Sequence, residues 1–127
     1  MSQQTSSREE LARPQWHDVF ESLTKEYEGW DVTIEVVSRV YGDQFPAERL
    51  PFTYIEYDPK DDVFAISVGG RDGRYPVVLN HMIPHPQRIY VTAAVLDSPL
   101  AVAVIGQDGT ETVVKFFRRP PLPPPNA

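Results

Sequence analysis

Apolar side chains recur at three- and four-residue steps in the segment that follows Pro14. Trp16, Val19, Phe20, Leu23 and Tyr27 share this spacing. Residues three and four apart lie on one face of a helix, so the set forms an apolar stripe. Proline suits the first turn of a helix, and glycine suits its end. The pattern predicts an amphipathic helix between Pro14 and Gly29.

From Trp30 onward the period of the pattern changes from about four to two. Apolar Val32, Ile34 and Val36 alternate with Thr33 and Glu35, as in a strand with one face on the core. Similar runs predict further strands at 52–57, 63–68, 77–79, 88–96, 100–105 and 112–117. The segment 41–51 contains Gly and Pro and is predicted to be a connection. Prolines at 84 and 86 favour an edge position for 77–79.

The predicted fold class is α+β, with one N-terminal amphipathic helix packed on a mainly antiparallel sheet of five to seven strands. The basis is the short, turn-rich spacing of the strands, together with the need of an apolar sheet face for a covering layer. We expect a flexible N-terminus at 1–12, a single domain at 13–117 and a disordered proline-rich tail at 118–127, where proline favours polyproline II.

Composition narrows the classes of partner. The chain has 127 residues and a formal charge of −6, with 18 acidic and 12 basic side chains, which disfavours nucleic acid and membrane surfaces. It has no cysteine, which excludes disulfides, thiol nucleophiles and cysteine-bound zinc. The first dozen residues are polar, and no apolar run approaches the length of a membrane span, so we expect a cytoplasmic protein.

Candidate metal and cofactor sites receive little support from the sequence. His81 and His85 have a spacing that on a helix would suit zinc, but the neighbouring prolines forbid a helix. On an extended chain the two rings lie roughly 13 Å apart, too far to share an ion. The acidic turn with Asp58, Asp61 and Asp62 is interpreted as solvated, and no helix follows the glycines at 69–73 to complete a phosphate loop. We expect no metal and no cofactor.

The tail offers a candidate docking peptide. Arg118, Pro121 and Pro124 fit the spacing with which polyproline segments enter aromatic grooves, where the arginine meets an acidic rim. Such proline-rich ends also arise by composition alone and then serve as a solubilising tail.

The chain also resembles a known family. The residues that carry the resemblance are Trp16, Phe20 and Leu23, the run 32–36, Asp43-Gln44, Leu50-Pro51-Phe52, Tyr57-Asp58, the His and Pro residues of 81–86, and Asp108-Gly109 with Thr112. In this order they are similar to the domain of unknown function 5335 family, small bacterial proteins with no established activity. The resemblance implies a stand-alone cytoplasmic protein and assigns no catalytic or binding residue.

Two functions remain open at this level. The favoured one is a non-enzymatic module that binds a protein, either an unknown partner or a second copy in a homodimer. The alternative is a small-ligand-binding protein or small enzyme, in which His81, His85, Arg71 and Asp72 converge at a sheet edge. No catalytic residue is assigned, and an enzyme is the less favoured of the two.

Overall fold

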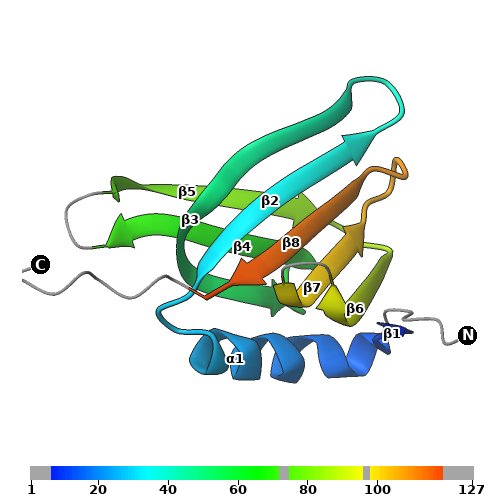
Figure 1. The fold of residues 1–127 in the computed structure, drawn as a ribbon. Coiled ribbons are helices and arrows are strands. Elements are labelled where there is room, and N and C mark those ends of the chain that lie inside the picture. Colours follow the sequence, from blue (N-terminus) through cyan, green and yellow to red (C-terminus); the bar gives the residue numbers. More distant parts are fainter. Residues whose placement is uncertain (1–6, 72–74, 96–97, 119–127) are drawn as a thin grey trace, which may run out of the picture.

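The computed structural model describes residues 7–71, 75–95 and 98–118. These residues form eight strands, one α-helix and a short 3-10 helix (Figure 1). In chain order the elements are β1 (Ser7–Glu10), η1 (Arg13–Gln15), α1 (Trp16–Glu26), β2 (Asp31–Ser38), β3 (Gly42–Asp58), β4 (Val63–Arg71), β5 (Tyr75–Pro84), β6 (Arg88–Val95), β7 (Ser98–Ile105) and β8 (Glu111–Phe117).

All eight strands belong to one antiparallel sheet with the order β1-β6-β7-β8-β2-β3-β4-β5. Two meanders, β2 to β5 and β6 to β8, meet where β8 pairs with β2 over Asp31–Val37. The N-terminal strand β1 pairs with β6 at one end of the order, and β5 forms the other end. Strands β1 and β5 are therefore the two edges of the sheet.

The predicted α+β class with five to seven strands was wrong. The fold is mostly sheet, with eight antiparallel strands and a single α-helix of 11 residues among those described. One added strand is β1, which lies within the segment 1–12 that the sequence predicted to be flexible. The largest difference is β3, because its first half occupies the predicted connection at 41–51.

Two irregularities explain how β3 remains a strand through its prolines. The register between β2 and β3 shifts twice. One shift lies between Ile34 and Val36 of β2, opposite Pro46 of β3, and the second lies between Val32 and Ile34. At the second shift Arg49 adopts a positive φ of 55°, and its N–H is bonded to the Thr33 hydroxyl. Bulges of this kind accept residues that would interrupt a regular ladder. A 17-residue strand can therefore form where composition suggested a loop.

The core lies between α1 and two parts of the sheet (Figure 1). One part consists of β6, β7, β8 and β2, and the other of β3, β4 and β5. The helix buries Trp16, Phe20 and Leu23, and the Phe20 ring meets Phe64 of β4 edge-on at 5.3 Å between centroids. The other fully or nearly buried apolar residues of this cluster are Val32, Ile34, Ala47, Phe52, Ile55, Tyr57, Ile66, Val68, Ile89, Leu100, Val102, Val104, Val114 and Phe116. No helix in the described part of the chain has the length and apolarity to cross a membrane.

Helix α1 also covers an exposed length of β3. Beyond Pro51 this strand no longer pairs with β2, so its main-chain groups on that side need other partners. The Thr24 hydroxyl donates to the Ile55 carbonyl at 2.8 Å and accepts from the Ile55 N–H at 3.1 Å. One side chain thus satisfies both main-chain groups of Ile55.

Candidate functional site

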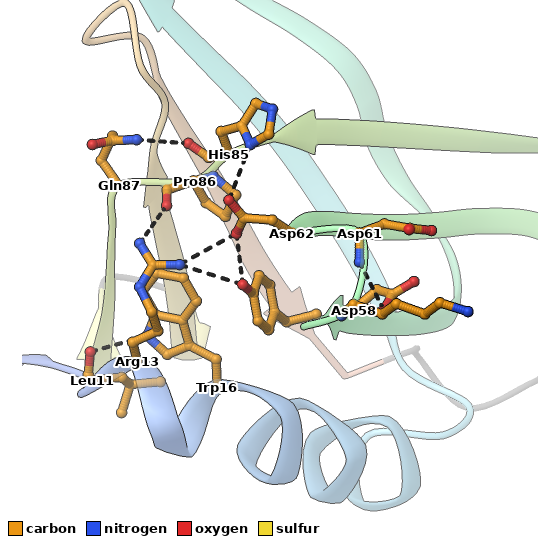
Figure 2. Close-up of polar contacts among 11 residues, drawn as sticks. Leu11, Arg13, Trp16, Asp58, Asp61, Asp62, His85, Pro86 and Gln87 are labelled. Atoms are coloured by element: carbon orange, nitrogen blue, oxygen red, sulfur yellow. Dashed lines mark hydrogen bonds and ion pairs between the residues drawn. The ribbon is translucent and has the colours of Figure 1, made fainter.

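A polar cluster around Asp62 joins three segments that are far apart in the sequence (Figure 2). One carboxylate oxygen of Asp62 accepts from the Tyr57 hydroxyl at 2.6 Å and from the Arg13 guanidinium at 3.2 Å. Its other oxygen lies 3.0 Å from Nδ1 of His85. Arg13 also donates to the Pro86 carbonyl at 3.1 Å. We call Arg13, Tyr57, Asp62, His85 and Pro86 the Asp62 cluster.

The backbone at the Asp62 cluster is unusual. Asp62, which ends the β3–β4 turn, and His85, which follows β5, have positive φ angles of 55° and 52°. The two positions support each other, because the His85 N–H donates to the Asp62 carbonyl at 2.8 Å. Left-handed conformations are costly for residues with a Cβ and persist where surrounding bonds enforce them.

Electrostatics keep Asp62 ionised. The hydrogen bonds from Tyr57 and His85, with the nearby charge of Arg13, lower the pKa of the Asp62 carboxyl. Burial is the main cause that raises the pKa of Tyr57, so its hydroxyl stays protonated and can donate at neutral pH. The cluster is a carboxylate surrounded by three donors. These bonds hold η1, the β3–β4 hairpin and the end of β5 together.

An Asp–His pair also occurs in general-base catalysis, where the carboxylate orients the imidazole. Here the pairing occupies Nδ1 of His85 and leaves Nε2 as the ring nitrogen that faces away from Asp62. Among the described residues no hydroxyl is bonded to this ring. Asp62 can therefore orient the His85 ring, but the described residues place no nucleophilic hydroxyl next to that ring.

His81 has different surroundings. It lies on β5, opposite Ile66 of β4, and is half-buried. With Ile83 of the same strand it lines a groove of about 380 Å³ that also touches the β7–β8 turn at Asp108. Burial lowers the pKa of His81, so its ring is neutral at pH 7.

The structure describes three of the four residues that the sequence predicted to bind a ligand, and it places them in different surroundings. His81 faces the groove beside the β7–β8 turn, whereas His85 belongs to the Asp62 cluster. The backbone of Arg71 is opposite Tyr75, six residues and roughly 20 Å along β5 from His81. Asp72 lies outside the described residues, so convergence of the four remains a prediction. Sequence reasoning missed Arg13 and Tyr57, and it interpreted Asp62 as solvated.

The predicted docking tail is largely outside the described residues. Pro121 and Pro124 are not among them. Arg118 is exposed, and its guanidinium carbon lies 5.3 Å from the centre of the Trp30 ring. The docking peptide therefore stays a prediction.

One exposed group on α1 has the atoms of a metal site. The ligand atoms of His17, Asp18 and Glu21 lie within 4.8 Å of one another. A hydrogen bond from His17 to Asp18 raises the pKa of this histidine. His17 and Glu21 also line a groove of about 270 Å³ between the helix and β3. All three side chains are in solvent, where such groups are common without an ion.

Strand β5 exposes one whole edge, which we call the free edge of β5. The described part of the chain pairs β5 with β4 alone. Ile55 turns its main-chain groups toward Thr24 and away from β4, so Ile66 opposite it turns toward β5. His81, opposite Ile66, therefore bonds to β4, and the neighbours Asn80 and Met82 direct their N–H and C=O groups outward.

The two edges of the sheet differ in charge. Strand β1 has four residues, of which Arg8, Glu9 and Glu10 are charged. Strand β5 has ten residues and no Asp, Glu, Lys or Arg. Leu79 and Met82, on opposite faces of β5, are 37% and 60% exposed. Proteins commonly protect edge strands by shortness and charge, and β1 has both features while β5 has neither.

Comparisons with known proteins find relatives without an assigned activity. A family model described as "Family of unknown function (DUF5335)" matches residues 7–125. An "Uncharacterized protein" of Aquifex aeolicus (strain VF5) is 32% identical over 114 residues, which cover 89% of this chain and 95% of the relative. No solved structure matches. The family resemblance predicted from the sequence is confirmed.

Proposed function

The chain belongs to DUF5335, a family of unknown function, and on that premise we propose that it is a non-enzymatic protein-binding module. It accepts an extended strand of a protein on the free edge of β5. The observation that supports this proposal is the contrast between the short, charged strand β1 and the long, uncharged strand β5. The cytoplasmic location stays a prediction.

Strand addition follows from the chemistry of an open edge. Each N–H and C=O that points outward can bond to an incoming strand, which gives affinity with little demand on sequence. Exposed Leu79 and Met82 lie on the two faces of β5 and can each contact a side chain of that strand. The absence of charge from β5 means that no ion has to be desolvated when a strand pairs there.

The alternative function needs polar groups within reach of one ligand. His81 lines a groove beside the β7–β8 turn, while the carboxylate of Asp62 already binds Nδ1 of His85. An enzyme or small-ligand site would need these groups to converge. Their separate surroundings support the binding module over the alternative.

A peptide with the sequence of residues 75–84 tests the proposal directly. It is added to the 15N-labelled full chain, and the backbone amide signals are followed by NMR. We expect the signals of Asn80 and Met82 to shift and their hydrogen exchange to slow, because these N–H groups point outward. The signals of β1 should not move.

The matched control is the same peptide with methyl groups on the amide nitrogens of its Asn80 and Met82. It keeps every side chain and loses the two donors that pair with an edge. We expect no shift with this peptide. Equal shifts with both peptides would mean that hydrophobic contact, and not strand addition, causes the binding. No shift with either peptide, each in large excess over a dilute chain, would overturn the proposal.

A further inference from the structure

We propose that the strand accepted by the free edge of β5 is β5 of a second copy, paired antiparallel about a two-fold axis through Asn80. This inference rests on the proposed function and names its partner. The pairing joins two eight-stranded sheets into one continuous sheet of the dimer. Such an interface is self-complementary, because each residue meets its symmetry mate across the axis.

The positions of the prolines in β5 select the register. Pro76 and Pro84 lie near its two ends, and Asn80 is midway between them. Pro84 occupies a position whose N–H would point outward, so the missing donor costs nothing on the side of β4. With Asn80 on the axis the two prolines oppose each other outside the ladder.

The outward main-chain groups match in this register. Asn80 opposes Asn80 of the second copy, and Val78 opposes Met82. These residues alternate with those that bond to β4, so each opposed pair exchanges two N–H···O=C bonds. The central part of both edges is satisfied in a single symmetric arrangement.

Charge favours the β5 edge over other surfaces of the chain as the place where two copies meet. The chain has a formal charge of −6, which makes two copies repel each other over most of their surfaces. Strand β5 is free of charged residues, so its edge is a place where copies can approach without opposing like charges. Leu79 opposes His81 across the axis, and the ring of His81 is half-buried.

The size of the contact sets its strength. The stretch between the prolines has seven residues, far fewer than the 20 to 30 per partner of a standard interface. We therefore expect a reversible dimer whose fraction rises with concentration. Among the described strands, β5 is the one long edge without a charged residue, so the pairing closes at two copies.

Charge substitutions at the axis provide the first test. Asn80→Lys and Asn80→Asp each place like charges opposite one another in the dimer, whereas a mixture of the two variants places opposite charges there. Light scattering on the full chain over a range of concentrations should show a dimer for the unmodified protein. We expect the dimer of each variant alone to have a dissociation constant about five- to tenfold higher than that of the unmodified dimer. The equimolar mixture of the two variants should dimerise again.

Restoration in the mixture shows that the variants are folded. Equal masses for the unmodified chain and both variants, measured alone and mixed, would overturn the proposal. Unfolding of either variant is detected by circular dichroism. In that case the second test decides.

A single introduced thiol gives the second test, because the natural chain has no cysteine. Opposed residues in a hydrogen-bonded antiparallel pair have Cα atoms about 5.5 Å apart, within the range of a disulfide. We expect Asn80→Cys to form a covalent dimer under mild oxidation. Lys60→Cys, in the exposed β3–β4 turn, is the control and should form no covalent dimer.

The peptide experiment and the dimer experiments together separate this inference from the proposed function. If the 75–84 peptide shifts Asn80 and Met82 but the full chain stays monomeric without a disulfide, the module binds strands and its partner is another protein. That result overturns the homodimer alone. If neither peptide nor second copy binds, both proposals fail.

Discussion

Tyr57 is the residue through which the Asp62 cluster meets the core. The residue is 5% exposed, and its ring packs edge-on against Trp16 at 5.0 Å between centroids. Its hydroxyl donates to Asp62 at 2.6 Å. Tyr57→Phe removes the hydroxyl and keeps the ring. We expect the free energy of unfolding to fall by about 1–2 kcal/mol at pH 7, measured by urea denaturation. Tyr54→Phe, which removes the hydroxyl of a half-buried residue that has no described bond to Asp62, is the control.

The same variant has a defined pH dependence. The folded pKa of Asp62 is lower than its ordinary value of 3.8, so its ionised form stabilises the fold above that value. This contribution is lost as the pH falls through the lowered pKa. The stability difference between Tyr57→Phe and the natural chain should therefore shrink in acid. A difference that stays constant from pH 7 to pH 2 would separate the hydroxyl from the charge of Asp62.

Single residues show where sequence reasoning ends. Helical spacing identified Trp16, Phe20 and Leu23, and all three are buried. Arg13 gave no signal, because its partners Asp62 and Pro86 are 49 and 73 positions away. Asp62 stood in an acidic turn of ordinary composition. Its bond to Tyr57 depends on the direction of that side chain, which no spacing in the chain records.

At the scale of the elements, the Thr24 hydroxyl joins α1 to the main chain of β3. Thr24 bonds both main-chain groups of Ile55, where β3 lacks a neighbouring strand. Thr24→Val keeps the shape and leaves these groups unpaired. We expect a loss of about 1–3 kcal/mol in the free energy of unfolding and faster hydrogen exchange at the Ile55 amide. Thr24→Ser keeps the hydroxyl and should retain slow exchange there. Fast exchange in both would show that the methyl group, not the bond, protects this edge.

The elements that sequence reasoning missed have a common cause. The rule that proline and glycine mark connections placed a loop at 41–51, yet bulges at Pro46 and Arg49 carry β3 through it. The polar strand β1 lacks an apolar alternation of its own, since it is a solvent-exposed edge that pairs with β6. In both places a neighbouring strand imposes the extended conformation, and local composition does not.

At the level of the whole molecule, strand order was beyond the reach of the sequence. Hairpin neighbours follow from short turns, but the pairs β1–β6 and β2–β8 join segments about 80 residues apart. These two pairs decide which strands become edges. They therefore also decide that the charged strand β1 covers β6 and that the uncharged strand β5 is left open.

Removal of β1 should change how the molecule associates. Strand β1 covers β6 from Tyr90 to Ala93, a stretch without charge. A chain that lacks residues 1–10 then has two open edges, β5 without a charged residue and β6 with Arg88 alone at its start. Two open edges per copy allow growth without closure. We expect light scattering to show species larger than a dimer that increase with concentration, while near-ultraviolet circular dichroism from Trp16 and Trp30 stays unchanged.

Two further chains identify which edge causes the growth. The deletion combined with Asn80→Lys blocks pairing through β5 and leaves β6 open, so association should again stop at two copies. A full-length chain with Glu9→Ala and Glu10→Ala keeps β1 short, keeps the charge of Arg8 and keeps the β1 main chain over β6, so we expect it to behave like the natural protein. Growth in that chain would show that the charges of β1 protect the edge. A deletion chain with the mass of the full-length protein would contradict a protective role for β1 altogether.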